Sequence, residues 1–312
     1  MKYTLYTAVI ILLLFTGCGK NTALDPSDVP PIVTGSLNFG TDQTLDIVTW
    51  NILNFPRPET NIPVLAEMIT ALHVDVIAFQ EIDDTQAFYN MAATIPYYNA
   101  FVSTINSNDT NLGYLYDTRT VTVNANYPIY TNESNPFPRR PYVLDITWQN
   151  QQYYIINNHL KAYDDNVIDP TDSWDNERRR QLACQKLDQY VTNTLPDKNV
   201  VILGDMNDQI QDPPAYNVFM TFINKPLEYL FADMPLALNP IDINFSYPST
   251  RSNIDHILIS NELFDDFADG GSYCHTILAE SWLGSWLTYK TSISDHRPVG
   301  IRLAQPTIKI KP

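Results

Sequence analysis

The stretch Ile293-Ser294-Asp295-His296-Arg297-Pro298-Val299 lies near the end of the chain and leads into an apolar run. That run predicts a strand at Val299–Leu303, so the Asp295-His296 pair stands where a strand begins. A carboxylate can hold a divalent cation, and a neighbouring imidazole can take a proton from water. By itself the dipeptide is not specific, and its meaning depends on what the rest of the chain offers.

Five further segments combine the end of a predicted strand with chemically active side chains. They are Trp50-Asn51, Gln80-Glu81, Asn157-Asn158-His159-Leu160-Lys161, Gly204-Asp205-Met206-Asn207 and Asn253-Ile254-Asp255-His256. In open sheets a site lies where strands end, and oxygen atoms of Asn, Asp and Glu suit a hard cation such as Mg²⁺. Asp205 and Asn207 are two apart, so on an extended chain both side chains face one side. These segments predict one shared site.

Apolar periodicity predicts more strands than helices. The expected strands are Leu45–Asn51, Val74–Phe79, Leu112–Tyr116, Thr120–Ala125, Tyr142–Trp148, Tyr153–Asn157, Val200–Leu203, Ile254–Ile259 and Val299–Leu303, with helices at Pro63–Leu72 and Glu177–Val191. Helices that cross between strands, with polar residues collected at strand ends, indicate an α/β fold. We expect a layered sandwich with two sheets inside and helices outside.

The composition is that of one large globular domain, with 44% hydrophobic and 17% charged residues in a chain of 312. The formal net charge is −16. Such a surface repels polyanions at long range, so a phosphodiester substrate requires local cations and bound metal. The alternative is that the acidity serves solubility outside the cell.

The N-terminus predicts export. Met1-Lys2 precedes an apolar run, Leu5–Phe15, that is too short to span a bilayer, and the sequence up to Cys18 resembles a bacterial lipoprotein signal. Lipidation of Cys18 would anchor the chain to a membrane of the cell envelope, on its periplasmic or outer-surface face. An ordinary secretory signal with an incidental cysteine is the alternative. The predicted organisation is a signal peptide at 1–17, lipidated cysteine and tether at 18–43, domain at 44–305 and tail at 306–312.

Two cysteines remain beyond Cys18, namely Cys184 and Cys274. An oxidising compartment permits a disulfide between them. Two buried thiols are the other reading, and the sequence leaves both open. Their number and spacing do not match a cysteine zinc site.

Taken in order, Trp-Asn, Gln-Glu, Asn-His-Leu, Gly-Asp-Met-Asn, Ile-Asp-His-Ile-Leu and Ser-Asp-His-Arg-Pro-Val resemble the motifs of the endonuclease/exonuclease/phosphatase superfamily. This superfamily includes deoxyribonuclease I, exonuclease III, inositol polyphosphate 5-phosphatases and bacterial sphingomyelinases. The resemblance covers roughly residues 45 to 303 and is specific because all six motifs occur in order. It implies a four-layer α/β/β/α sandwich with two mainly antiparallel central sheets.

The resemblance also implies a metal-dependent site. Glu81 would be the principal ligand of Mg²⁺, with Mn²⁺ or Ca²⁺ as alternatives, and Asn51 and Asp295 would complete the metal and phosphate contacts. His296 would act on the attacking water, with its ring oriented by Asp255. Such a pair is chemically suited to the task, since a carboxylate fixes the tautomer of an imidazole base.

Other residues would contact the reacting phosphate. The resemblance implies that Asp205 and Asn207 position the water and the phosphorus, and that His159 donates to a phosphate oxygen or to the leaving group. Arg139 resembles a phosphate-contacting arginine of the nuclease branch. For Arg139 and Lys161, phosphate contact and a solvated surface role are both open. In deoxyribonuclease-like members a carboxylate orients the histidine at the position of His159, and here Asp109 is the available carboxylate.

The sequence favours a DNA or RNA endonuclease, acting as a monomer. Asp208-Gln209 and Asn253-Ile254-Asp255 depart from the inositol phosphatase motifs. A sphingomyelinase-like lipid phosphodiesterase is the first alternative, because the segment Glu280–Tyr289 contains Trp282 and Trp286, as in an aromatic hairpin that enters a membrane. A non-catalytic binding lipoprotein is the second alternative.

Overall fold

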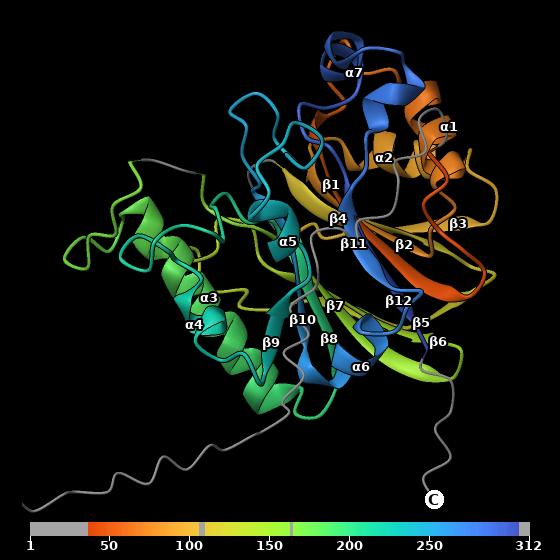
Figure 1. The fold of residues 1–312 in the computed structure, drawn as a ribbon. Coiled ribbons are helices and arrows are strands. Elements are labelled where there is room, and N and C mark those ends of the chain that lie inside the picture. Colours follow the sequence, from red (N-terminus) through yellow and green to blue (C-terminus); the bar gives the residue numbers. More distant parts are fainter. Residues whose placement is uncertain (1–36, 106–109, 163–164, 306–312) are drawn as a thin grey trace, which may run out of the picture. The chain divides into compact units, whose positions relative to one another are not determined.

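The computed structural model describes residues 37–105, 110–162 and 165–305, and within them two six-stranded sheets pack face to face (Figure 1). The first sheet has the order β11-β12-β1-β2-β4-β3, with β1 (Thr44–Phe55), β2 (Val76–Ile82), β3 (Tyr98–Val102), β4 (Asn111–Asp117), β11 (Tyr273–Thr276) and β12 (Val299–Ala304). The second has the order β5-β6-β7-β8-β10-β9, with β5 (Val121–Pro128), β6 (Tyr142–Trp148), β7 (Gln151–His159), β8 (Asn199–Asp205), β9 (Tyr229–Phe231) and β10 (Asp255–Ser260). Each sheet has one parallel pair, β1–β2 or β7–β8, and its other pairs are antiparallel.

Helices cover the outer faces of both sheets. The longer ones are α1 (Ile62–Leu72), α2 (Thr85–Ala92) and α3 (Asn176–Thr194), and the short ones are α4 (Met220–Ile223), α5 (Met234–Ala237), η2 (Asn261–Leu263), α6 (Phe264–Phe267), η3 (Ala279–Trp282) and α7 (Trp286–Ser292). Helices α1 and α2 pack on the first sheet, and α3 and α4 pack on the second (Figure 1). This architecture confirms the predicted layered sandwich with mainly antiparallel sheets.

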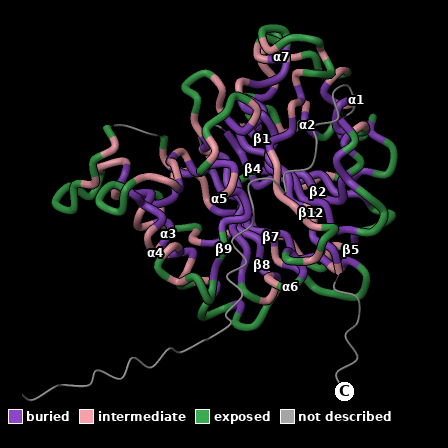
Figure 2. The backbone as a smooth tube through the Cα atoms, in the orientation of Figure 1, coloured by how far each residue is buried: buried purple, intermediate pink, exposed green. Residues whose placement is uncertain are grey.

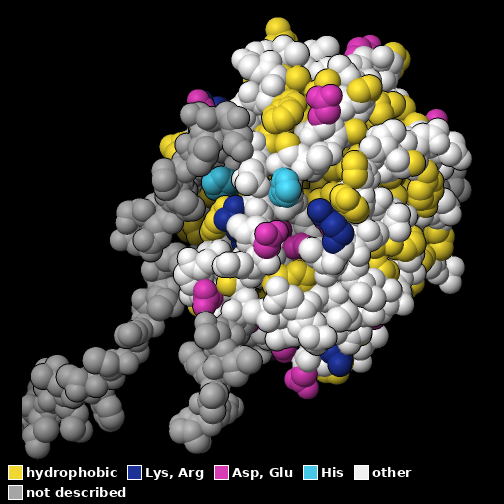
Figure 3. Space-filling view, turned by 90° about the vertical axis from the view of Figure 1, so that its right-hand side faces the viewer, with side chains coloured by type: hydrophobic (Ala, Val, Ile, Leu, Met, Phe, Trp, Pro, Cys, Tyr) yellow, Lys and Arg dark blue, Asp and Glu magenta, His cyan; other side chains and the backbone are white. Residues whose placement is uncertain are grey.

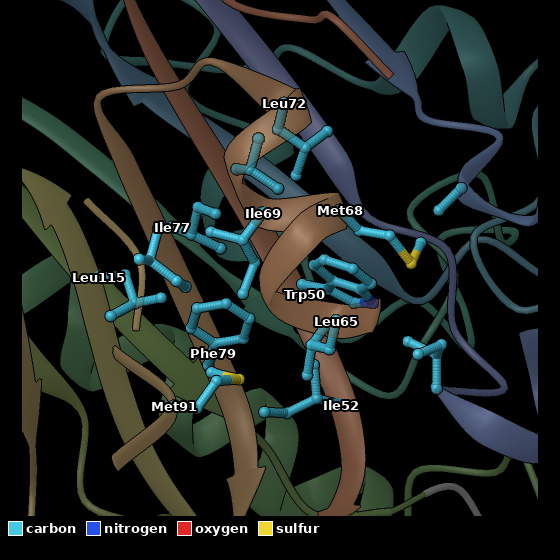
Figure 4. Close-up of a cluster of buried hydrophobic side chains, with 14 of the residues drawn as sticks. Trp50, Ile52, Leu65, Met68, Ile69, Leu72, Ile77, Phe79, Met91 and Leu115 are labelled. Carbon is cyan, nitrogen blue, oxygen red and sulfur yellow. The ribbon is translucent and has the colours of Figure 1, made fainter. Parts of the chain in front are cut away.

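Three apolar layers follow from the alternation of side chains along the strands. In β1, Leu45 and Ile47 point between the sheets, whereas Val48 and Trp50 point toward α1. Figure 4 shows Trp50 packed among helix and strand side chains in this outer layer. The tube view shows the strands as the buried centre of the domain (Figure 2). The middle apolar layer therefore holds the two sheets together, and each outer layer holds helices on one sheet.

Two buried amide side chains, Gln80 and Asn157, bond to each other between the sheets, near the edge where β2 and β7 end. Gln80 in β2 donates from Nε2 to Asn157 Oδ1 in β7 at 2.8 Å, and Asn157 donates to the carbonyl oxygens of Phe79 and Gly113 at 2.9 and 3.1 Å. Buried amides with satisfied partners specify one alignment of the two sheets. Because β1 and β2 run in parallel, as do β7 and β8, their carboxyl ends meet at this edge.

All the predicted strands and both predicted helices are present, several of them longer than expected. Strands β3, β9 and β11 and most of the short helices were not predicted from the sequence. The segment with Trp282 and Trp286 does not form the hairpin that the sphingomyelinase-like alternative would require, because η3 and α7 occupy it. Cys184 and Cys274 are both free thiols; Cys184 is buried, as the second reading expected, whereas Cys274 is half-buried.

The first described residues belong to the domain. Leu37 and Phe39 are buried, and the backbone N–H groups of Phe39 and Gly40 donate to the carbonyl oxygen of Leu72 at 3.0 and 2.8 Å. The packed unit therefore begins before the predicted boundary at residue 44. The predicted signal peptide, Cys18, most of the predicted tether and the predicted tail at 306–312 lie outside the described residues. Within the described ranges no helix combines the length and apolar character needed to cross a membrane.

Candidate active site

Strand register brings the predicted residues of both sheets to one edge. In the second sheet His159 and Asp255 are both paired with Asp205, the last residue of β8. In the first sheet Asn51 is paired with Gln80, the residue before Glu81. The contact between the two groups is direct, because they share hydrogen bonds across the sheet interface.

Asn51 forms that contact. Its Nδ2 donates to Glu81 Oε1 and to Asp205 Oδ2, both at 2.9 Å, while its Oδ1 accepts the N–H of Leu53 at 2.9 Å. The other Glu81 oxygen accepts the N–H of Asn54 at 2.9 Å. Glu81 has φ of 63°, in the left-handed region, which aims its side chain out of the regular strand direction. Asn51 thus places two carboxylates of different sheets side by side.

The donor set fits a divalent cation. Ligand atoms of Glu81, His159 and Asp205 lie within 4.8 Å of one another, and those of Asp205, Asp255 and His296 form a second such group that shares Asp205. Burial raises the pKa of Asp205, as do the carboxylates of Asp255 and Glu81, despite the lowering effect of His296. Bringing these negative groups together is unfavourable without a positive charge among them. Oxygen-rich sites of this kind suit Mg²⁺.

Asp295 lies at the rim of the same group. Its Oδ2 is 3.4 Å from the hydroxyl of Tyr247, and its Oδ1 is buried and has no hydrogen-bond partner among the described residues. A buried carboxylate oxygen without a donor is destabilising unless something else satisfies it. A cation or its hydration water would do so.

His296 is held by Asp255 from the opposite sheet. Nδ1 of the ring lies 2.8 Å from Asp255 Oδ2, and Nε2 faces Asp205 Oδ2 at 3.8 Å. Burial disfavours the charged ring, but the adjacent carboxylates, Asp255 above all, outweigh burial and raise the pKa of His296 to about 10. Asp255 therefore fixes the orientation of the ring and stabilises its protonated form.

His159 has the opposite electrostatic character. Its ring is buried, with Nε2 3.5 Å from Asp205 Oδ2 and 3.8 Å from Glu81 Oε1. Burial, followed by the positive charges of Arg139, His296 and Lys161, lowers its pKa well below the ordinary value. Nδ1 has no hydrogen-bond partner among the described residues. Asp109, the carboxylate expected to orient this ring, lies outside them.

Arg139 reaches the site from the segment before β6. Its Nε donates to the hydroxyl of Thr110 at 2.9 Å, and its charge interacts with Glu81, Asp205 and Asp83. Burial lowers its pKa, as expected for a guanidinium withdrawn from water. This placement favours phosphate contact over a solvated surface role. Lys161 is half-buried, two residues beyond His159.

Asn207 is placed by a turn. The expectation that Asp205 and Asn207 share one face of an extended chain is wrong, because β8 ends at Asp205 and Asn207 has φ of 55°. The N–H of Asn207 donates to Asp205 Oδ1 at 3.1 Å, and its Nδ2 donates to the carbonyl oxygen of Leu160 at 3.3 Å. An aspartate that bonds the backbone two residues on forms a local turn. Through the bond to Leu160, the turn after β8 is held against the chain segment that follows β7.

Two residues at the site had no role in the sequence analysis. Tyr247 packs against His296 with ring centres 4.7 Å apart, and it comes from a loop without a recognisable motif. Ser294 donates from Oγ to the carbonyl oxygen of Asn51 at 2.6 Å and accepts the N–H of His296 at 3.0 Å. Ser294 stands in the quoted stretch beside Asp295, so its position in the motif was a usable signal.

Three solved structures illustrate the likeness of this fold. D. rerio TDP2 complexed with single strand DNA product is 14% identical, with a TM-score of 0.62, over 85% of this chain and 100% of that chain. The human Nocturnin catalytic domain with bound sulfate anion is 17% identical, with a TM-score of 0.59, over 84% and 93%. An endonuclease/exonuclease/phosphatase from Bacteroides vulgatus is 12% identical, with a TM-score of 0.58, over 84% and 99%. At these identities the likeness concerns the fold.

No curated protein matches the chain in sequence. The model of the Endonuclease/Exonuclease/phosphatase family does match, over residues 48–296, which span the strands and motifs described above. The chain therefore belongs to the endonuclease/exonuclease/phosphatase family, whose members are metal-dependent hydrolases of phosphoester bonds.

Proposed function

We propose that this protein is a Mg²⁺-dependent nuclease that cleaves DNA or RNA internally while anchored to the bacterial cell envelope. The observation that carries the proposal is the position of Asp205. Its Oδ2 accepts a hydrogen bond from Asn51 at 2.9 Å and faces Nε2 of His159 and of His296 at 3.5 and 3.8 Å. Acid–base groups and candidate metal ligands thus converge on one point.

Glu81, Asn51 and Asp295 would hold Mg²⁺, which when bound offsets the negative charge of a phosphate. To bind the cation, the amide oxygen of Asn51 would have to give up the hydrogen bond that it now accepts from the N–H of Leu53. The carboxylate of Glu81 already lies beside that of Asp205, with ligand atoms of the two within 4.8 Å. The hardness of the oxygen donors favours Mg²⁺ or Mn²⁺ over softer metals.

The protein side chains supply the remaining chemistry. The ring of His296, whose pKa is raised by the carboxylates around it, would lose its proton more readily beside a bound cation. In its neutral form, oriented by Asp255, it takes the proton of the attacking water, and Asp205 with Asn207 positions that water against the phosphorus. His159 is neutral because its pKa is lowered, so it donates a hydrogen bond to the phosphate without repelling the cation. Arg139 adds a positive charge where negative charge develops on the phosphate oxygens.

Nucleic acid is the favoured substrate. The relative D. rerio TDP2 was solved with a single strand DNA product. The face in Figure 3 shows Lys and Arg side chains few and well separated, and the chain as a whole is acidic. Long-range attraction to a polyanion is therefore weak, and recognition depends on the cation and on Arg139. We expect slow association and strong dependence on the metal.

A lipid phosphodiester is the second candidate, because two apolar side chains in the segment that precedes Asp295-His296 are exposed. Trp282 is 41% and Leu287 73% exposed. Trp286 differs, since it is half-buried against Tyr289 and under the guanidinium of Arg297, at ring-centre distances of 5.6 and 5.3 Å. Trp282 and Trp286 therefore do not form the protruding aromatic pair that would favour membrane insertion. The nuclease proposal is therefore the stronger.

Supercoiled plasmid, single-stranded RNA and sphingomyelin vesicles, each with Mg²⁺ or EDTA, test the substrate. We expect nicking of plasmid or cleavage of RNA with Mg²⁺ alone, and loss of that activity in Asp205→Ala. Asp242→Ala is the matched control, because Asp242 is exposed on a surface loop. Cleavage of sphingomyelin without cleavage of nucleic acid would replace the nuclease proposal. Full activity of Asp205→Ala would place the catalytic centre elsewhere, and no cleavage of any of the three substrates by the wild type would favour a binding protein.

The envelope anchor rests on the sequence of residues 1–18. Cys18→Ala should move the protein from the membrane fraction to the soluble fraction in cells that process lipoproteins. Mass spectrometry of the wild-type N-terminus should find acyl chains on Cys18, and a free thiol there would contradict the anchor. Sedimentation of the detergent-free domain tests the expected monomer.

A further inference from the structure

A buried group of charges lies beneath the turn that carries Asp205 and Asn207. Arg180, in the first turns of α3, is completely buried. Its Nη2 is 2.9 Å from Glu177 Oε1, and its Nε is 2.9 Å from Asp208 Oδ2. One guanidinium thus joins helix α3 to the turn that follows β8.

The same guanidinium also holds the segment after β7. Nη1 of Arg180 donates to the carbonyl oxygens of Lys161 and Ala162, at 2.9 and 3.0 Å. These residues directly follow His159 and Leu160. Arg180 therefore binds from below the two chain segments that carry His159 on one side and Asp205 on the other.

These two segments contact each other above Arg180. The N–H of Leu160 donates to the carbonyl oxygen of Asp205 at 3.0 Å, and Asn207 donates to the carbonyl oxygen of Leu160 at 3.3 Å. A shift of either segment would thus move His159, Asp205 and Asn207 relative to one another.

The turn is held from a second direction by His256. Nε2 of this buried ring is 2.7 Å from the carbonyl oxygen of Asp208, and Nδ1 is 2.6 Å from Asp233 Oδ2. His256 follows Asp255 in β10 and is paired with Gly204 in β8. Asp208 is therefore fixed through its side chain by α3 and through its backbone by β10.

Such a network is not required for stability alone. Buried ion pairs are desolvated at a large free-energy cost, and well-packed apolar residues of similar volume often stabilise a protein equally well. What the network adds is geometry, because the rigid donor fork of an arginine accepts one arrangement of its partners. We propose that Arg180 is a positioning residue for phosphodiester hydrolysis, which aligns His159, Asp205 and Asn207 by binding the segments beneath them. This inference rests on the proposed function of the site.

Arg180→Lys tests the inference, because lysine keeps the charge and loses the fork. Asp208→Asn is the second variant, and Arg178→Lys is the matched control, because Arg178 lies in the same helix and its half-buried guanidinium bonds Gln181 of that helix. Rates are measured well below the melting temperature of each variant. We expect kcat on a phosphodiester to fall about 10- to 100-fold in Arg180→Lys, with KM and the half-saturating Mg²⁺ concentration unchanged. A lower melting temperature with unchanged kcat would overturn the inference.

A double-mutant cycle with Asn207→Ala separates positioning from a general loss of structure. If Arg180 acts through the turn, Arg180→Lys should lower kcat much less when Asn207 is already alanine. Additive effects would contradict this route.

Hydrogen exchange without metal provides a readout independent of activity. Backbone amides at 158–162 and 203–210 should exchange faster in Arg180→Lys, whereas those of β2 should not change. Unchanged exchange at the turn would overturn the positioning claim even if the wild type is active. If these amides exchange faster in Arg180→Lys but the wild type cleaves no phosphodiester, Arg180 does hold the two segments and the proposed function is wrong.

Discussion

His296 and Asp255 belong to different sheets, and their side chains meet with Nδ1 and Oδ2 2.8 Å apart. His296 precedes β12 in the first sheet, and Asp255 begins β10 in the second. A base and the carboxylate that orients it are thus joined only when the two sheets are stacked in register. The buried amides of Gln80 and Asn157, which bond across the same interface, hold that register.

Asp255→Asn should abolish most of the activity. The amide group keeps the size of the side chain but cannot stabilise a protonated His296, and it can bond the wrong tautomer of the ring. We expect kcat to fall about 10²- to 10⁴-fold with little change in folding. Steady-state hydrolysis of bis(p-nitrophenyl) phosphate measures this, with Asp242→Asn as the control. Near-normal turnover would mean that His296 is not the base.

Glu81→Gln should weaken metal binding. The substitution removes one negative charge from the carboxylate pair bridged by Asn51 while preserving a hydrogen-bonding side chain. We expect the dissociation constant for Mg²⁺, measured by isothermal titration calorimetry without substrate, to rise at least about tenfold. Glu59→Gln, at an exposed position before α1, should leave it unchanged. Equal affinities for wild type and Glu81→Gln would place the metal elsewhere.

Gly204→Ala should destabilise the domain. Gly204 has φ of 138°, and a Cβ there would lie 2.0 Å from the carbonyl oxygen of Asn158 in the neighbouring strand. Both the backbone strain and the clash oppose folding, so we expect a loss of at least about 3 kcal/mol in urea unfolding. Gly270→Ala, where a Cβ meets nothing within 4 Å, is the control. Similar unfolding midpoints for the two variants would contradict the close approach of β7 and β8.

Asp46 should make the domain less stable as pH rises. Burial is the main cause that raises its pKa from 3.8 to about 7, so the folded state binds this proton more tightly than the unfolded chain does. The stabilisation is present below about pH 4 and is lost as pH rises through about 7, by at most about 4 kcal/mol at 1.36 kcal/mol per pH unit.

Urea unfolding of wild type and Asp46→Asn between pH 4 and 8 measures this effect. The wild type should lose stability relative to the variant across the range. Exposed Asp172→Asn should follow the wild type at every pH. Parallel curves for wild type and Asp46→Asn would show that Asp46 titrates normally.

The sequence was sufficient for the elements whose signal is local. Alternation in β1 and β6, the apolar run of β8 and the spacing in α1 are properties of neighbouring residues, so the sandwich could be predicted from them. Short elements such as β9 and β11 were missed because three or four residues carry too little periodicity. The helices that contain Trp282 and Trp286 were not predicted because aromatic residues suit strands and helices alike when packing decides.

The sequence by itself also determined which residue types gather at strand ends, and hence the family and a phosphoester-hydrolysing site. Only the tertiary structure decided their division of labour. The opposite pKa shifts of His159 and His296 depend on burial and on which charges the second sheet brings near each ring. The place of Asn207 depends on a left-handed turn rather than on strand alternation. The pKa shifts, like the bond from Asn207 to the carbonyl oxygen of Leu160, arise from residues far apart in the chain, and no local pattern encodes the distances between them.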